Sequence, residues 1–71
     1  MDLNAEIGAR VRWLRMAQSF TQERLAADAG VSQQYLSDLE RGRRNPTVHT
    51  LEMVARALNV TINALFEFAE K

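Results

Sequence analysis

The stretch that decides the fold is QERLAADAGVSQQYLSDLER, residues 22–41. Gly30, near its middle, can adopt the positive φ that ends a helix. Ala26 is small enough to let a second helix approach the first, and Ser32 is a favoured N-cap for that second helix. Two helices that cross at about 90–120° through a short, often Gly-containing turn form a helix-turn-helix. The stretch therefore predicts this motif.

A local pattern that marks helix starts occurs four times in the chain. An apolar residue or proline precedes Thr or Ser, and a leucine stands four positions after that hydroxyl residue. The hydroxyl is expected to cap the helix while the two flanking side chains pack as a hydrophobic staple. The predicted caps are Thr21, Ser32, Thr47 and Thr61.

A further helix is expected before these four, from Asp2 or Asn4 to about Gln18. The sequence thus predicts an all-α, compact five-helix bundle without strands, forming one domain over residues 1–71. Helical periodicity selects its core. The expected core residues are Ile7, Val11, Leu14, Leu25, Ala26, Val31, Leu36, Leu39, Leu51, Val54, Ala55, Leu58, Val60 and Leu65.

Composition argues against several functional classes. The 71 residues include no cysteine, which excludes disulfides and thiol chemistry, and no stretch approaches the ~20 apolar residues of a membrane span. His49 stands alone, without the spacing of a metal site, and no nucleophile or phosphate-loop motif is present. We therefore expect a cytoplasmic protein that is not an enzyme and needs no metal, cofactor or small-molecule ligand, with His49 exposed on a helix.

Beyond the central stretch, residues 7–66 resemble the Cro and phage-repressor (XRE-type) family of transcription regulators. The resemblance lies in IGARVRWLR, TQERLA, AGVSQQYLSDLERGRRNP, TLEMVARAL and NVTINALF. It implies a lambda-repressor-like DNA-binding fold, with the second and third helices as the helix-turn-helix. It also implies a homodimeric, sequence-specific regulator on a near-palindromic operator, acting by blocking or recruiting RNA polymerase. GRRNP followed by TLEMVARAL is similar to the controller proteins of restriction-modification systems.

Under this interpretation the helix at residues 32–41 enters the major groove of double-stranded DNA. Because Leu36 and Leu39 face inward, polar side chains point outward as base readers. These candidates are Gln33, Gln34, Ser37 and Asp38. A glutamine amide can donate to adenine N7 while it accepts from the N6 amine. Asp38 either accepts from a cytosine amine or orients a neighbouring Gln or Arg, and we favour the orienting role because phosphates repel a bare carboxylate.

Phosphate contacts are expected on both sides of this helix. Gln22 begins the preceding helix, at the positive end of its dipole, where the resemblance implies a clamp on the DNA backbone; the plain alternative is a favourable helix-start residue. Tyr35 either contacts a phosphate or packs on the surface. The RGRRNP loop resembles the family's backbone-gripping loop. Its candidates are Arg41, Arg43, Arg44, Asn45 and Thr47.

The charge balance limits this interpretation. Nine basic residues offset nine acidic ones, and the pI is about 6.6. Few phosphate contacts imply modest non-specific affinity, so base contacts and dimerisation must contribute more.

Two further predictions concern the scaffold and the dimer. The resemblance implies a structural ion pair between Arg15 and Glu40, and a dimer interface through the C-terminal helix. The interface candidates are Ile62, Phe66 and Phe68. For Phe68 the alternative to an interface role is burial within its own chain. For Trp13 we expect such burial. An alternative function is an antitoxin-like protein-interaction module that binds DNA secondarily, although only about six residues follow Leu65 to grip a partner.

Overall fold

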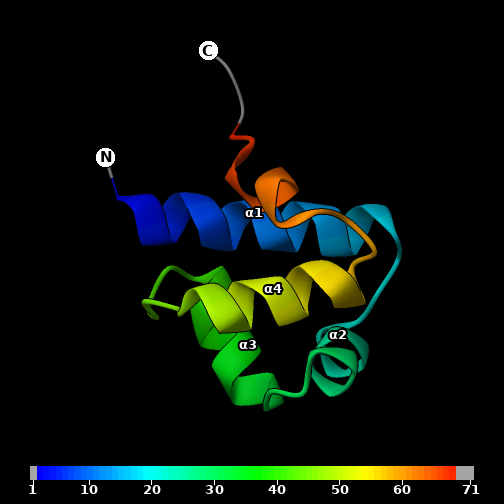
Figure 1. The fold of residues 1–71 in the computed structure, drawn as a ribbon. Coiled ribbons are helices and arrows are strands. Elements are labelled where there is room, and N and C mark those ends of the chain that lie inside the picture. Colours follow the sequence, from blue (N-terminus) through cyan, green and yellow to red (C-terminus); the bar gives the residue numbers. More distant parts are fainter. Residues whose placement is uncertain (1, 69–71) are drawn as a thin grey trace.

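Four α-helices and a short 3₁₀ helix make up the part of the chain that the computed structural model describes, residues 2–68. No strand occurs in these residues, so the all-α prediction is confirmed. Figure 1 shows the elements in order. They are α1 (Leu3–Ala17), α2 (Gln22–Ala29), α3 (Gln33–Glu40), α4 (Val48–Ala57) and the 3₁₀ helix η1 (Ile62–Phe66).

Each α-helix begins at a side-chain cap. The first cap is Asp2, whose carboxylate accepts from the Ala5 amide at 3.2 Å. In α2, α3 and α4 the oxygens of Thr21, Ser32 and Thr47 accept from the amide three residues later, at 3.0–3.1 Å. These predicted starts are therefore confirmed. Gly30 ends α2 in the left-handed conformation, with φ of 76°, as its position predicted.

The prediction of a fifth α-helix capped by Thr61 is wrong. The Thr61 side chain makes no cap hydrogen bond, and the Ala64 amide bonds to the Thr61 carbonyl at 3.0 Å, an i→i+3 contact. A segment of five residues holds little more than one turn, which 3₁₀ bonding closes more tightly than α bonding. The staple leucine still reaches the core, since Leu65 is fully buried.

The helices enclose one hydrophobic core. α1 contacts α3 and η1, α2 contacts α3 and α4, and α4 contacts η1. In Figure 1, α1 lies along one side of the molecule, with η1 against it and the α2–α3 pair on the opposite side. Twelve of the fourteen predicted core residues are buried. Val31 and Val60 are only partly buried at the core edge, and the buried Ala29 was missed.

A close approach of α1 to the end of α3 depends on Gly8. A Cβ at this position would overlap the Leu39 carbonyl oxygen and would lie 2.8 Å from that of Glu40. Only the absence of a side chain lets the two helices meet here. Gly8 therefore sets the position of the C-terminal end of α3 against α1.

Candidate nucleic-acid interface

The outer face of α3 carries the predicted base readers. Leu36 and Leu39 are fully buried, which turns the opposite face of this two-turn helix toward solvent. The exposed Gln33 and Gln34 stand at its N-terminal end, just after the Ser32 cap. Ser37 and Asp38 follow one turn later and are half-buried. The structure thus brings all four polar side chains onto the outward side of one helix.

Asp38 connects this face to the loop that follows α3. Its Oδ1 accepts from Gln34 Nε2 at 3.1 Å, and its Oδ2 lies 3.6 Å from Arg44 Nη2. The Arg44 guanidinium also stacks on the Tyr35 ring, with Cζ 5.1 Å from the ring centroid. Both orienting contacts considered for Asp38, to a glutamine and to an arginine, are present. Tyr35 is half-buried and packs against the core, so its ring forms a platform for Arg44.

The basic loop is held against the end of α3 by its backbone. The amides of Arg41 and Arg43 both bond to the Asp38 carbonyl, at 3.2 and 2.9 Å. The side chains of the loop are exposed. They belong to Arg41, Arg43, Arg44, Asn45 and Thr47. The Thr47 oxygen caps α4, and its hydroxyl donates to Thr50 Oγ1 at 3.1 Å. The loop therefore presents three guanidinium groups beside the candidate base readers.

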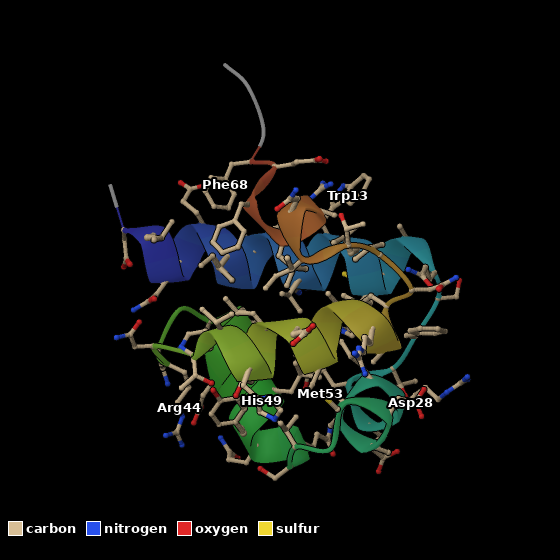
Figure 2. The ribbon with its side chains drawn as sticks, viewed as in Figure 1. Trp13, Asp28, Arg44, His49, Met53 and Phe68 are labelled. Carbon is tan, nitrogen blue, oxygen red and sulfur yellow. The ribbon has the colours of Figure 1, made fainter. Side chains whose placement is uncertain are left out.

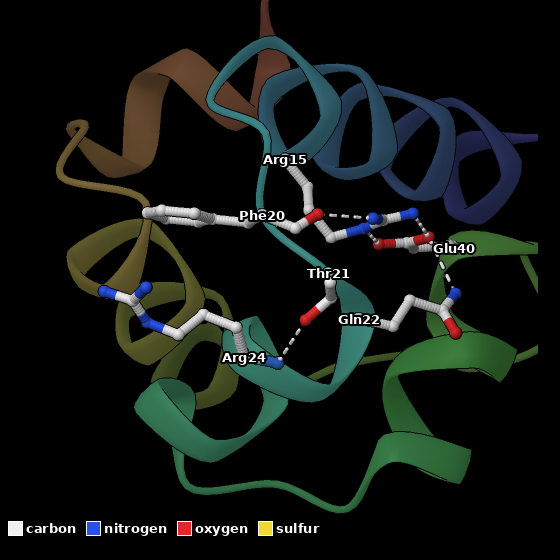
Figure 3. A network of polar contacts seen from close by, with 6 residues as sticks. All are labelled: Arg15, Phe20, Thr21, Gln22, Arg24 and Glu40. Atoms are coloured by element: carbon white, nitrogen blue, oxygen red, sulfur yellow. Dashed lines mark hydrogen bonds and ion pairs between the residues drawn. The ribbon is translucent and has the colours of Figure 1, made fainter.

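A buried polar network fixes the orientation of α3 (Figure 3). Arg15 Nε and Nη2 donate to the two carboxylate oxygens of Glu40 at 2.7 and 3.1 Å, so the ion pair implied by the resemblance is present. The side chains are 12% and 2% exposed. Arg15 Nη1 also donates to the Phe20 carbonyl at 2.7 Å. The network therefore joins α1, the α1–α2 turn and the end of α3.

Gln22 is the third side chain of this network. Its Nε2 donates to Glu40 Oε1 at 3.0 Å, which ties the start of α2 to the end of α3. Sequence reasoning missed this contact because the partners are 18 residues apart and no local pattern marks it. The amide keeps a second N–H and its carbonyl oxygen for other partners.

A cleft between α1, α2 and α3 opens beside this network. Polar and charged side chains line it, including Arg12, Gln22, Ser37 and Arg41. Sequence reasoning also missed Arg12, an exposed residue one turn before Arg15 on α1. The cleft thus adds a guanidinium to those supplied by the loop.

The predicted dimer residues lie apart from this surface. In Figure 2, Phe68 lies near α1 and η1, whereas Arg44 lies on the side of α3. Phe66 is 42% exposed, while Ile62 and Phe68 are partly buried against the core. The rings of Phe66 and Phe68 meet edge to face, with centroids 6.4 Å apart. The last three residues of the C-terminal tail, 69–71, lie outside the described residues.

The prediction that Trp13 is buried within its own chain is wrong, because its side chain is 61% exposed. Arg10 holds the C-terminal segment on α1 by donating from Nε to the Ala64 carbonyl at 2.9 Å. The Arg10 guanidinium stacks on Trp13, 5.0 Å from the ring centroid. The indole therefore covers an arginine at the surface and does not enter the core. Its helix neighbour Met16 is likewise exposed, at 55%.

The chain, including its α2–α3 pair, is similar to known helix-turn-helix proteins in sequence and in structure. A family model described as helix-turn-helix matches residues 11–65. This chain belongs to the helix-turn-helix family, in its XRE-type branch. The relatives of this helix-turn-helix protein include an HTH-type transcriptional regulator, a phage immunity repressor and a restriction-modification controller protein.

Three relatives illustrate the family. The HTH-type transcriptional regulator y4dJ of Sinorhizobium fredii is 52% identical over 61 residues, which cover 86% of this chain and 79% of y4dJ. The immunity repressor protein of Bacillus phage phi105 is 42% identical over 59 residues, covering 83% of this chain and 41% of the repressor. The chain thus spans less than half the length of that repressor. The crystal structure of the restriction-modification controller protein C.AhdI from Aeromonas hydrophila superposes with a TM-score of 0.86 at 35% identity, over 87% of this chain and 94% of C.AhdI.

Two kinds of feature are absent from the described residues. No helix within residues 2–68 is long and apolar enough to cross a membrane. The same residues contain no cluster of three or more histidine, aspartate or glutamate side chains that could hold a metal ion. His49 is exposed on α4.

Proposed function

We propose that this helix-turn-helix protein is a sequence-specific transcriptional regulator, and not an enzyme, that binds a near-palindromic operator as a homodimer. In this proposal α3 of each protomer enters the major groove, and the two helices occupy successive grooves roughly 34 Å apart. One observation carries the proposal. The outer face of α3 presents two exposed amides at its N-terminal end, directly beside a loop with three exposed arginines.

The proposed division of labour follows the chemistry of these side chains. Gln33 and Gln34 read base edges with their amides, and Ser37 adds a hydroxyl one turn later. Phosphates are held by the free backbone N–H groups and second amide hydrogen at Gln22 and by the arginines of the loop. Asn45 and Thr47 contribute at the start of α4. Phosphate contacts position the protein, whereas base contacts select the sequence.

The buried network supports this proposal by its placement. Glu40 receives hydrogen bonds from Arg15 on α1 and from Gln22 on α2, so the orientation of α3 is coupled to both neighbouring helices. Rigid placement matters because amide hydrogen bonds to base edges tolerate only small displacements. The network thus serves as a scaffold for base reading.

Dimerisation is proposed from the charge balance and from the C-terminal segment. A chain with zero net charge gains little long-range attraction to DNA, and two linked protomers double the number of contacts. Phe66 is the most exposed of the three interface candidates, with Ile62 and Phe68 beside it. Sedimentation of a Phe66→Glu variant tests this point. Its distribution should shift to monomer while the circular dichroism spectrum stays unchanged, and an unshifted dimer would remove Phe66 from the interface.

The likeness to C.AhdI supports a narrower proposal, a controller protein of a restriction-modification system. A regulator bound near a promoter acts by blocking or recruiting RNA polymerase, so the polymerase is the proposed protein partner. Transcription assays on the operator with and without the protein distinguish a repressor from an activator. No change in either direction would contradict a regulatory role.

Gel-shift titration at several salt concentrations tests DNA binding itself. With Arg41, Arg43 and Arg44 contributed by two protomers, about six phosphate contacts give a slope of about −5 in log Kobs against log[salt]. Gln34→Ala removes one bidentate base contact from each of the two half-sites, so it should weaken operator binding about 30-fold or more and leave binding to random duplex almost unchanged. If Gln34→Ala bound both DNAs as the parent does, the proposed base reading would be wrong.

A further inference from the structure

We propose that Asp38 sets the base preference of Gln34. By accepting one amide hydrogen, it fixes the order in which Gln34 presents its oxygen and its remaining N–H to the groove, and this order selects adenine. The inference rests on the proposed function, because it assumes that α3 reads DNA. It assigns Asp38 the part of a positioning residue that acts through Gln34.

The contact between the two side chains has a defined polarity. Gln34 and Asp38 are one helical turn apart, and Gln34 Nε2 lies 3.1 Å from Asp38 Oδ1. An ionised carboxylate can only accept hydrogen bonds, so the amide must turn its nitrogen and not its oxygen toward Asp38. A rotation of the amide by 180° would place two acceptors against each other. One orientation of Gln34 is therefore favoured before DNA arrives.

A fixed amide is a more selective reader than a free one. Adenine offers an acceptor at N7 and a donor at N6, which match a glutamine N–H and oxygen in one order only. A glutamine that rotates freely can offer its donor and acceptor in either order and so adapts to other base edges. With one N–H held by Asp38, Gln34 keeps its oxygen and one N–H in a set order. This arrangement matches adenine at one position in each half-site.

The carboxylate of Asp38 is paired with the cation of Arg44, which stacks on Tyr35, and this pairing reduces the repulsion between Asp38 and DNA. Arg44 Nη2 lies 3.6 Å from Asp38 Oδ2, and its guanidinium stacks on Tyr35. The cation balances a charge that phosphates would otherwise repel. The same contact partly withholds Arg44 from the phosphates. Asp38 thus increases sequence discrimination and lowers general attraction to DNA.

The test is selection from a pool of duplexes with a randomised central segment, followed by binding titrations on the selected sequence and on random duplex. Asp38→Asn is nearly isosteric, but its amide can face Gln34 as donor or acceptor and so permits both orientations. We expect the adenine preference at one position per half-site to fall about tenfold. Affinity for random duplex should rise, because the variant removes a negative charge from the surface that faces the phosphates and frees Arg44 from Asp38.

A matched control separates positioning from simple charge. Asp28→Asn removes the same charge from another carboxylate–arginine pair, Arg24–Asp28 on α2. It should leave the base preference unchanged. The Gln34→Ala background supplies the second arm. If Asp38 acts through Gln34, adding Asp38→Asn there should change no base preference, whereas a carboxylate that contacts a base directly would still change it.

The outcomes are distinct. If the parent selects a sequence but Asp38→Asn selects it with the same adenine preference, the role of Asp38 is overturned and the proposed function stands. If Asp38→Asn changes the preference equally with and without Gln34, the mechanism through Gln34 is overturned. If the folded parent enriches no sequence at all, the proposed function fails, and this inference fails with it.

Discussion

Replacing Glu40 by glutamine tests how the domain holds its α3 helix. The carboxylate is 2% exposed and accepts from Arg15 Nε, Arg15 Nη2 and Gln22 Nε2. A glutamine has only one oxygen and turns an NH₂ group toward at least one of these donors. Arg15, 12% exposed, also loses its counter-charge. Removing one partner of a buried pair costs about 3–5 kcal/mol.

That loss is large for a domain of this size. With about 0.05–0.15 kcal/mol per residue, a chain of 71 residues has a free energy of unfolding of about 4–11 kcal/mol. At about 4–8 °C per kcal/mol, Glu40→Gln should lower Tm by at least about 12 °C. Urea and thermal unfolding followed by circular dichroism measure both quantities.

The exposed Arg24–Asp28 pair supplies the matched control. Its side chains are 61% and 43% exposed, so Asp28→Asn should cost less than about 1 kcal/mol. Replacing Arg15 and Glu40 together by methionine should recover most of the loss, because no buried charge then remains unpaired. The reasoning is refuted if Glu40→Gln costs no more than Asp28→Asn, or if the double variant is less stable than Glu40→Gln.

Four other variants test the fold at single positions. Gly8→Ala should cost about 1–3 kcal/mol or more in urea unfolding, since its methyl group overlaps the Leu39 carbonyl; an unchanged midpoint would contradict the close approach. Thr21→Ala should lower the free energy of unfolding by about 1 kcal/mol, because it removes the side-chain cap of α2. Thr61→Ala should change the free energy of unfolding by less than about 0.5 kcal/mol, because the Thr61 side chain makes no cap hydrogen bond. Equal effects of the two variants would contradict this difference between α2 and η1. Trp13→Phe should change stability by less than about 1 kcal/mol, and the parent's indole emission should lie near that of a solvated tryptophan; blue-shifted emission would contradict its 61% exposure.

The parts of the fold that local chemistry determines could be predicted from the sequence. A hydroxyl residue before an amphipathic segment reports directly on a helix start, and Thr21, Ser32 and Thr47 behave in this way. The pattern at Thr61 is the same in sequence but ends in a 3₁₀ turn. It marks where a turn begins and which leucine is buried, but it does not determine the hydrogen-bond register of a segment only five residues long.

The features that were missed depend on contacts between distant residues. Gly8 meets the end of α3, and Gln22 meets Glu40, across 31 and 18 residues of sequence. Nothing in helical periodicity identifies these partners. Trp13 shows that an apolar pattern on a helix does not by itself predict burial. Its spacing with Met16 defines a second apolar face on α1, but the C-terminal segment that lies along α1 is held by Arg10 and leaves the indole in solvent.

The central claim is that two copies of α3 read adjacent major grooves. The most direct measurement is a hydroxyl-radical footprint of the protein on the DNA upstream of its own gene. The account predicts two protected blocks with two-fold sequence symmetry, centred about 10–10.5 bp apart on one face of the duplex, that weaken together in Gln34→Ala. A single asymmetric block, or uniform protection that Gln34→Ala does not change, would contradict it.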